Sequence, residues 1–121
     1  MPTRLRFSRT ARLTRSSEFA RVKETGRSEH GRYMVCSVVQ VEAGEPTRIG
    51  LITSRRVGGA VVRNSIRRRL REIVRVDRPQ LAPGRWIVLI ARARAAEATF
   101  AQLRDEWRRL AKRVGLLVLD P

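Results

Sequence analysis

The sequence predicts an α+β fold, a small two-layer sandwich in which helices pack on a mostly antiparallel sheet. Three runs rich in apolar and β-branched residues, at 33–41, 48–54 and 86–91, are typical of strands. Two segments, 62–73 and 100–114, repeat apolar residues every three or four positions, as amphipathic helices do. With one more helix near the N-terminus, the order is helix, strand, strand, helix, strand, helix, which predicts helices packed on a sheet. The length of 121 residues corresponds to a single domain.

The first helix is predicted over residues 17–25. Ser16 is a suitable N-cap, Glu18 falls in the first turn, and Gly26 ends the pattern. Residues 1–13 precede this helix and are rich in arginine, so we expect a basic arm that is partly flexible.

The strands follow from composition. The run at 33–41 and the run at 48–54 are separated by AGEP at 43–46, which has the composition of a turn, and the two runs are therefore predicted to form a hairpin. The continuous apolar run WIVLIA at 86–91 predicts a strand that is buried on both faces.

The middle helix lies in VVRNSIRRRLREIV, residues 61–74, directly after a break at Gly58 and Gly59. One face carries an apolar stripe that we expect to pack on the core, formed by Val62, Ile66, Leu70 and Ile73. An adjoining face carries arginines at steps of four, extended by Asn64 and Arg68, and these arginines are Arg63, Arg67, Arg71 and Arg75.

The last helix begins with a capping-box pattern, Thr99 followed by Gln102, and Gly115 ends it. Its apolar stripe is predicted to be core and not a platform on which RNA bases stack, and it consists of Phe100, Leu103, Trp107, Leu110 and Val114.

The charge of the chain indicates a polyanionic partner. Lys and Arg number 27 against 11 Asp and Glu, a net charge of +16, and all but two of the basic residues are arginine. Like charges spaced four apart on a helix cost a few tenths of a kcal/mol per pair. Charged faces that are merely solvated usually mix signs, whereas only Glu72 interrupts this one. Nucleic acid is therefore favoured over an anionic membrane or an acidic protein.

The residues needed for catalysis by the protein are scarce. The single histidine, His30, lies in a polar, loop-like context, and no Cys/His cluster has zinc spacing. The adjacent acids Asp105 and Glu106 should point to different faces of a helix, and no other acids are grouped as a two-metal nuclease requires. Gly58 and Gly59 lack the Lys-Ser/Thr of a phosphate-binding loop, although the free amides of that helix start could hold a phosphate.

The location of the protein is predicted from similar observations. One cysteine, Cys36, cannot form a disulfide within the chain, which fits a reducing compartment such as the cytoplasm. The N-terminus has no apolar stretch of the kind found in a secretory signal, and no apolar run is long enough to span a membrane.

The stretch RIGLITSRRVGGAVVRNSIRRRLRE, residues 48–72, resembles the signature of the bacterial ribonuclease P protein subunit. The N-terminal part and the tail also fit this family, so the resemblance covers nearly the whole chain. The positions of the central motif that match in order are Arg55, Arg56, Val57, Gly58, Ala60, Val61, Arg63, Asn64, Arg67, Arg68 and Arg71.

This resemblance implies the protein subunit of a ribonucleoprotein endonuclease that removes the 5′ leader of precursor tRNA. Catalysis then belongs to the RNA subunit with its bound magnesium, no protein residue is catalytic, and the protein is expected to be a monomer without RNA. The residues implied to bind the RNA subunit are Arg55, Arg56, Arg63, Asn64, Arg67, Arg68 and Arg71. The residues implied to bind the leader, in a cleft between the first helix and the sheet, are Arg12, Phe19, Tyr33 and Ser37.

The resemblance also implies details of the fold. A short additional strand is expected near residues 27–30, which gives a sheet of about four strands. The strand–helix–strand unit is expected to cross over left-handed, as in domain 2 of ribosomal protein S5, against the usual rule.

Three positions depart from the family pattern. The third residue of the Arg-Asn-Arg triplet is Ser65, and Ser37 and Lys23 occupy cleft positions that are often aromatic. We therefore expect the leader to be held more by charge than by base stacking. Tyr33 shares strand parity with Ser37 and is kept as a cleft residue, with a core tyrosine at the strand edge as the alternative.

Two other functions remain open at this stage. A small ribosome-associated RNA-binding protein would share the charge and the salt-sensitive binding. A nuclease that acts without RNA is disfavoured, because the acids it needs are few.

Overall fold

The computed structural model describes residues 11–42 and 44–117. The elements follow in the order α1 (Ser16–Thr25), β1 (Arg27–His30), β2 (Met34–Gln40), β3 (Arg48–Thr53), α2 (Ala60–Asp77), β4 (Arg85–Ala91) and α3 (Phe100–Arg113), with short 3₁₀ helices η2 (Arg78–Gln80) and η3 (Ala93–Glu97). Most of the predicted basic arm, residues 1–10, lies outside the described residues.

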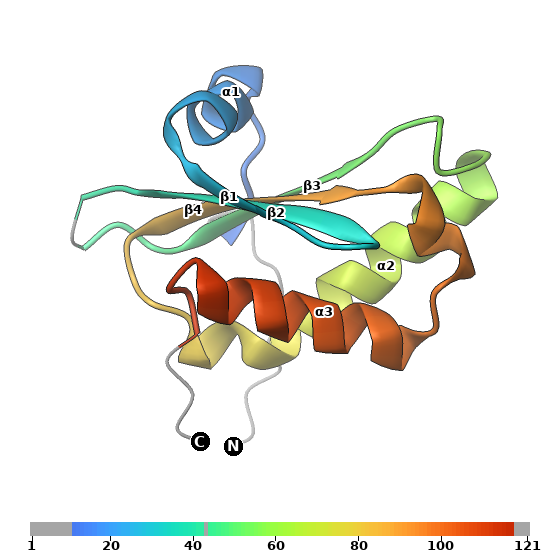
Figure 1. The fold of residues 1–121 in the computed structure, drawn as a ribbon. Coiled ribbons are helices and arrows are strands. Elements are labelled where there is room, and N and C mark those ends of the chain that lie inside the picture. Colours follow the sequence, from blue (N-terminus) through green and yellow to red (C-terminus); the bar gives the residue numbers. More distant parts are fainter. Residues whose placement is uncertain (1–10, 43, 118–121) are drawn as a thin grey trace, which may run out of the picture.

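The four strands form one sheet in the order β1-β2-β4-β3. Strand β2 pairs antiparallel with both β1 and β4, while β3 pairs parallel with β4. Helices α2 and α3 cover one face of the sheet and α1 lies on the opposite face (Figure 1). The predicted α+β sandwich with a mostly antiparallel sheet is confirmed, and α1 adds a partial layer on the second face.

The predicted hairpin of β2 and β3 is wrong, because β4 lies between these two strands. Strand β4 is the most apolar of the four, and three consecutive residues in it, Ile87, Val88 and Leu89, are buried. A central position buries both faces of such a strand, as its composition predicts, whereas an edge position would not. Helix α2 connects β3 to β4 as a parallel βαβ unit, and the left-handed crossover stays a prediction.

The short strand implied by the family resemblance is present as β1, an edge strand. His30 lies on it, opposite Val35 of β2, so the interpretation of His30 as a loop residue was wrong. Its sequence, RSEH, does not alternate apolar and polar residues. This edge strand is mostly exposed, so neither of its faces has to be apolar.

Helix α1 begins one residue earlier than predicted, so Arg15 and not Ser16 is the N-cap. The Glu18 carboxylate accepts hydrogen bonds from the backbone N–H groups of Thr14 (3.0 Å) and Arg15 (2.9 Å), which satisfies the amides at the start of the helix. These hydrogen bonds, above all the one from Arg15, hold the pKa of Glu18 below its ordinary value.

The main core lies between the sheet and the pair α2 and α3. Its largest fully buried side chains include Met34, Ile66, Leu70, Ile87, Leu89, Leu103, Trp107 and Leu110. Two predicted stripe residues are not core: Val62 is 38% exposed and Phe100 is 41% exposed. Each lies in the first turn of its helix. Cys36 belongs to this core, and burial raises the pKa of its thiol to about 12.

Two buried carboxylates fix α3 to its neighbours. Asp77, at the end of α2, accepts a hydrogen bond from Trp107 Nε1 (2.9 Å) and two from the Arg108 guanidinium (3.1 Å each). Glu106 accepts hydrogen bonds from the backbone N–H groups of Arg32 and Tyr33 in the turn between β1 and β2. As predicted, Glu106 and its neighbour Asp105 lie on different faces, one side chain 2% exposed and the other 70%.

Candidate nucleic-acid interface

Helix α2 carries several arginines that have no acidic partner within the described residues. Within the described residues, Arg75 is the only arginine of α2 that forms an ion pair, and its partner is Glu72 on the same helix. Helix α3 carries arginines too, but Arg104, Arg108, Arg109 and Arg113 each lie within 4.0 Å of a carboxylate. The arginines of α2 without an acidic partner in the described residues are Arg63, Arg67, Arg68, Arg69 and Arg71.

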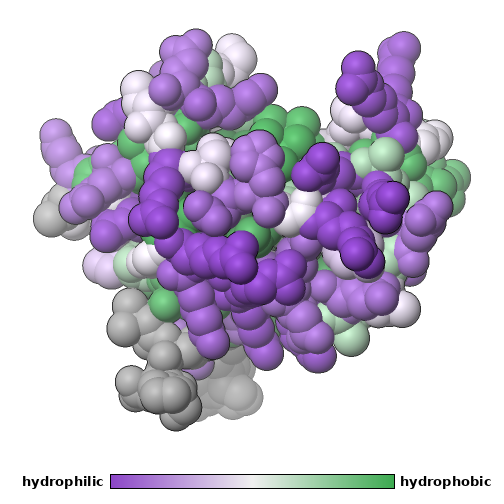
Figure 2. Space-filling model, in the orientation of Figure 1, coloured by the Kyte–Doolittle hydropathy of each residue, from purple (hydrophilic) through white to green (hydrophobic). Residues whose placement is uncertain are grey.

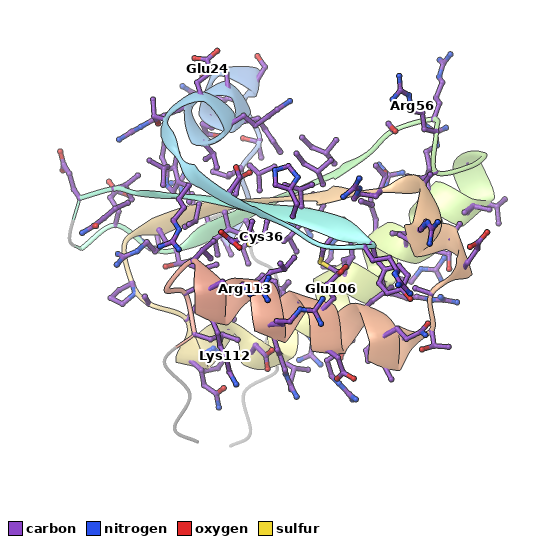
Figure 3. The ribbon with its side chains drawn as sticks, in the orientation of Figure 1. Glu24, Cys36, Arg56, Glu106, Lys112 and Arg113 are labelled. Atoms are coloured by element: carbon purple, nitrogen blue, oxygen red, sulfur yellow. The ribbon has the colours of Figure 1, made fainter. Side chains whose placement is uncertain are left out.

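The predicted contacts to the RNA subunit are brought together by this helix and the turn before it. Arg55 and Arg56 lie exposed in that turn, and Figure 3 shows Arg56 projecting from the end of the sheet. Asn64 accepts a hydrogen bond from the Arg67 guanidinium one turn further along α2. The predicted set therefore lies on α2 and in the turn before it.

The start of α2 is suited to an anion. Its N-cap is Gly59, which provides no side-chain cap, and no acidic residue lies in the first turn. Gly58 has a φ of 152°, which only glycine adopts without strain. The first amides of the helix thus carry no protein acceptor from an N-cap side chain, and Arg55, Arg56 and Arg63 lie close to them in the sequence.

A cleft of about 650 Å³ lies between α1 and β3, with Arg67 of α2 in its lining. Phe19, from α1, is the aromatic residue of this lining, which consists of Thr14, Ser16, Phe19, Ala20, Lys23, Glu24, Leu51, Ile52, Thr53 and Arg67. A smaller hollow of about 180 Å³ shares Phe19, Leu51 and Arg67 with the cleft and adds Arg12 and Arg71. Figure 2 shows a mostly hydrophilic surface, with hydrophobic area exposed beside α1 over the sheet.

The position of Phe19 depends on Gly50 in β3. A Cβ atom on Gly50 would lie 2.3 Å from the Phe19 ring, so any other residue at position 50 would displace the ring. The ring therefore lies directly against the backbone of β3, at the floor of the cleft.

Three arginines converge beside this ring from two segments of the chain. Arg12 is held along β3 by a bridge to Ile49, in which the N–H of Leu13 donates to the Ile49 carbonyl (3.0 Å). Partial burial lowers the pKa of Arg71, and the positive charges of Arg12 and Arg67 lower it further. Close guanidinium groups that repel one another mark a place where an anionic ligand would be favourable.

The other two predicted leader-binding residues do not line the cleft. Ser37 is 2% exposed, and its hydroxyl is hydrogen-bonded to that of Ser28 (2.7 Å). Tyr33 packs on the main core, on the α3 side of the sheet, so the parity argument that placed it in the cleft was wrong. The strand begins only at Met34, and alternation cannot be extended to a residue before it.

Several cleft residues were missed in the sequence. Leu51, Ile52 and Thr53 line the cleft because β3 is an edge strand, a position that the predicted hairpin did not give it. Gly50 offered a usable signal, since an isolated glycine in a strand often marks a close approach by another group. Lys23 does line the cleft at the position that is often aromatic in the family.

The cleft has an aromatic residue at its floor, Arg67 in its lining, and Arg12 and Arg71 in the adjoining hollow. Next to a helix with several arginines that lack an acidic partner, this arrangement defines a nucleic-acid-binding protein. In the described part of the chain, no three His, Cys, Asp or Glu side chains gather in a way that could hold a metal ion. No helix of the described residues is long and apolar enough to cross a membrane.

Comparison with known proteins gives the particular family. The family model described as Ribonuclease P matches residues 7–115, and the chain belongs to this family, as the protein subunit of a tRNA-processing enzyme. The ribonuclease P protein component of Symbiobacterium thermophilum is 43% identical over 106 residues, 88% of this chain and 92% of that protein. The corresponding component of Roseiflexus castenholzii is 41% identical over 112 residues, 92% of this chain and 91% of that protein. The alternative of a ribosome-associated protein finds no support in these comparisons.

Solved structures show the same fold. The RNase P protein of Staphylococcus aureus superposes with a TM-score of 0.82 at 26% identity, over 88% of this chain and 97% of that one. The RNase P protein of Thermotoga maritima gives a TM-score of 0.76 at 28% identity, over 85% of this chain and 96% of that one.

Proposed function

We propose that this subunit binds the RNA subunit of ribonuclease P through α2 and holds the 5′ leader of precursor tRNA in the cleft between α1 and β3. The observation that carries the proposal is the convergence of Arg12, Arg67 and Arg71 beside Phe19. A single strand needs backbone phosphates neutralised and at least one base stacked, and this cleft offers both kinds of contact.

The leader is held chiefly by charge. Among the described residues, Phe19 is the one aromatic side chain in the cleft lining, and base stacking on an aromatic contributes about 1–3 kcal/mol in single-strand binding. The guanidinium groups grip phosphate through paired donors, and this contact does not depend on the base. Binding should therefore be sensitive to salt and tolerant of leader sequence.

Catalysis is assigned to the RNA subunit. The described residues offer no cluster of acids that could hold magnesium, so this donor set does not fit a protein-held metal ion. Magnesium would instead be held mainly by RNA phosphates, and the contribution of the protein is to bind both RNAs and screen their mutual repulsion. The protein is expected to be a monomer before it binds RNA and to work in the cytoplasm, where precursor tRNA is made.

Reconstitution tests the proposal. Purified protein is mixed with the cognate ribonuclease P RNA and a precursor tRNA at low magnesium, and release of the 5′ leader is followed. Strong stimulation that requires both protein and RNA is expected. Tight RNA binding without stimulation would contradict the proposal, and cleavage by the protein in the absence of the RNA subunit would contradict the assignment of catalysis.

A further inference from the structure

A second basic hollow lies apart from the cleft. It has a volume of about 380 Å³ and is lined by Arg32, Arg92, Ala93 and Arg94, none of which lines the cleft. All three arginines are exposed, and none of them takes part in an ion pair within the described residues. Three cations around a hollow without a neutralising acid make a surface that would favour an anion.

The backbone that carries these arginines is fixed on two sides. The N–H of Arg92 donates to the Tyr33 carbonyl (2.8 Å), and the Arg92 guanidinium donates to the Gly31 carbonyl (2.8 Å). From α3, the buried Glu106 carboxylate accepts the N–H groups of Arg32 and Tyr33, and Figure 3 shows Glu106 on the side of α3 that faces the sheet. The turn before β2 and the end of β4 are therefore held together, and the backbone positions of their arginines are fixed.

Gly31 is required for this arrangement. A Cβ atom at position 31 would lie 2.2 Å from a carboxylate oxygen of Glu106. The close approach lets Glu106 reach the backbone of the turn, so the geometry of the hollow depends on the absence of a side chain at this position.

The hollow lies at the same end of the sheet as the first arginines of the predicted RNA interface. Strands β3 and β4 are parallel neighbours with Thr53 opposite Ala91, so both end at the same end of the sheet. Arg55 and Arg56 follow β3 there, and Arg92 and Arg94 follow β4. Arginines thus leave two adjacent strand ends, beside the cleft that Thr53 lines.

We infer that Arg32, Arg92 and Arg94 bind the phosphodiester backbone of RNA, as a contact separate from the cleft and from α2. Among the described residues that line the hollow, Ala93 alone is apolar, so recognition rests on charge and on the paired donors of guanidinium. The RNA subunit and precursor tRNA both have a phosphodiester backbone, so either could be the ligand. Limiting the choice to these two RNAs rests on the proposed function.

The test compares two double variants that remove the same charge. Arg32→Gln with Arg94→Gln removes two arginines of the hollow and leaves Arg92, which holds the Gly31 carbonyl. Lys112→Gln with Arg113→Gln removes two exposed cations of α3 and is the control. Filter binding between 100 and 400 mM salt gives the slope of log affinity against log salt, which changes by about 0.7–0.9 for each phosphate contact.

The hollow variant should reduce the magnitude of this slope by about 1.5 relative to the control variant. A reduction with the isolated RNA subunit identifies that RNA as the ligand, and a reduction only for precursor tRNA binding to the assembled holoenzyme identifies the tRNA. Equal slopes for the two variants in both assays would overturn the inference. This is also the result expected if the hollow binds an acidic protein and not RNA.

A conservative pair separates charge from structure. Arg32→Lys with Arg94→Lys keeps both charges and should retain the slope, and a loss as large as that of the Gln variant would also overturn the inference. Stimulated cleavage by the unchanged protein is measured in parallel. Its failure would contradict the proposed function, whereas the slopes with the isolated RNA subunit report on the hollow alone.

Discussion

At the scale of single residues, the cleft depends on the contact between Phe19 and Gly50. Phe19→Ala should weaken precursor tRNA binding by about 1–3 kcal/mol, the contribution of one base stack, and should leave mature tRNA nearly unaffected. Gly50→Ala should have the same direction of effect, because the added methyl group displaces the Phe19 ring. Binding of both tRNAs to the assembled holoenzyme measures this difference.

The control for these variants is Val76→Ala, which shortens a half-exposed side chain outside the cleft lining. An equal loss for precursor and mature tRNA would remove Phe19 from leader recognition and leave it a purely structural role.

At the scale of the elements, the arginine face of α2 is predicted to be the docking surface for the RNA subunit. Arg67→Glu with Arg71→Glu reverses two charges on side chains that are not part of the core, so the fold should persist. We expect an affinity loss of at least 100-fold for the RNA subunit, since each lost phosphate contact also turns into a repulsion. A filter-binding titration measures it, and Lys112→Glu with Arg113→Glu is the matched reversal on α3. Unchanged affinity would show that α2 is not the docking face.

The junction of α2 and α3 depends on Asp77. Asp77→Ala leaves the buried Trp107 N–H without its acceptor and removes the partner of Arg108, and it should lower the free energy of unfolding by about 2–3 kcal/mol. The half-exposed state of Arg108 keeps the loss below that of a fully buried ion pair. Urea denaturation measures it, with Asp105→Ala as the exposed control, expected within about 0.5 kcal/mol of the parent. A loss no larger than the control's would show that the Asp77 hydrogen bonds do not stabilise the junction.

Local sequence signals predicted the helices well, whereas the order of the strands in the sheet depends on pairing between distant segments and was predicted less well. The N-cap of α2 at Gly59 and the capping box of α3 at Thr99 are each encoded by a few adjacent residues. The pairing of β4 between β2 and β3 joins segments far apart in the sequence, and a turn-like composition at 43–46 cannot exclude it.

The candidate site shows the same division. The arginine face of α2 follows from helical periodicity, and Phe19 and Arg12 were placed in the cleft through the family resemblance. Tyr33 does not line the cleft, because the alternation of strand side chains was extended to a residue before the start of β2. Ser37 does not line it either, because its hydroxyl is hydrogen-bonded to Ser28 of the neighbouring strand. The convergence of Arg12 with Arg71 needed the bridge to β3, which no local pattern encodes.

At the scale of the whole molecule, the net charge of +16 couples stability to bound anions. Repulsion among unpaired arginines opposes folding, and an anion that binds only the folded chain stabilises it by mass action. Sodium sulfate at 10–20 mM should therefore raise the melting temperature by several degrees relative to sodium chloride of equal ionic strength. The increment should be smaller in the Arg67→Glu, Arg71→Glu variant. Equal melting temperatures in the two salts would contradict specific anion binding.

The bridge of Arg12 to Ile49 has a consequence for any shortened form of the protein. Residues 11–13 run beside β3, so at this point they cover one edge of the sheet, and the buried side chains of Ala11 and Leu13 close the seam. An uncovered strand edge invites pairing with a second molecule. A version trimmed beyond Leu13 would thus be expected to self-associate and precipitate, whereas one that begins before Ala11 keeps this edge sealed.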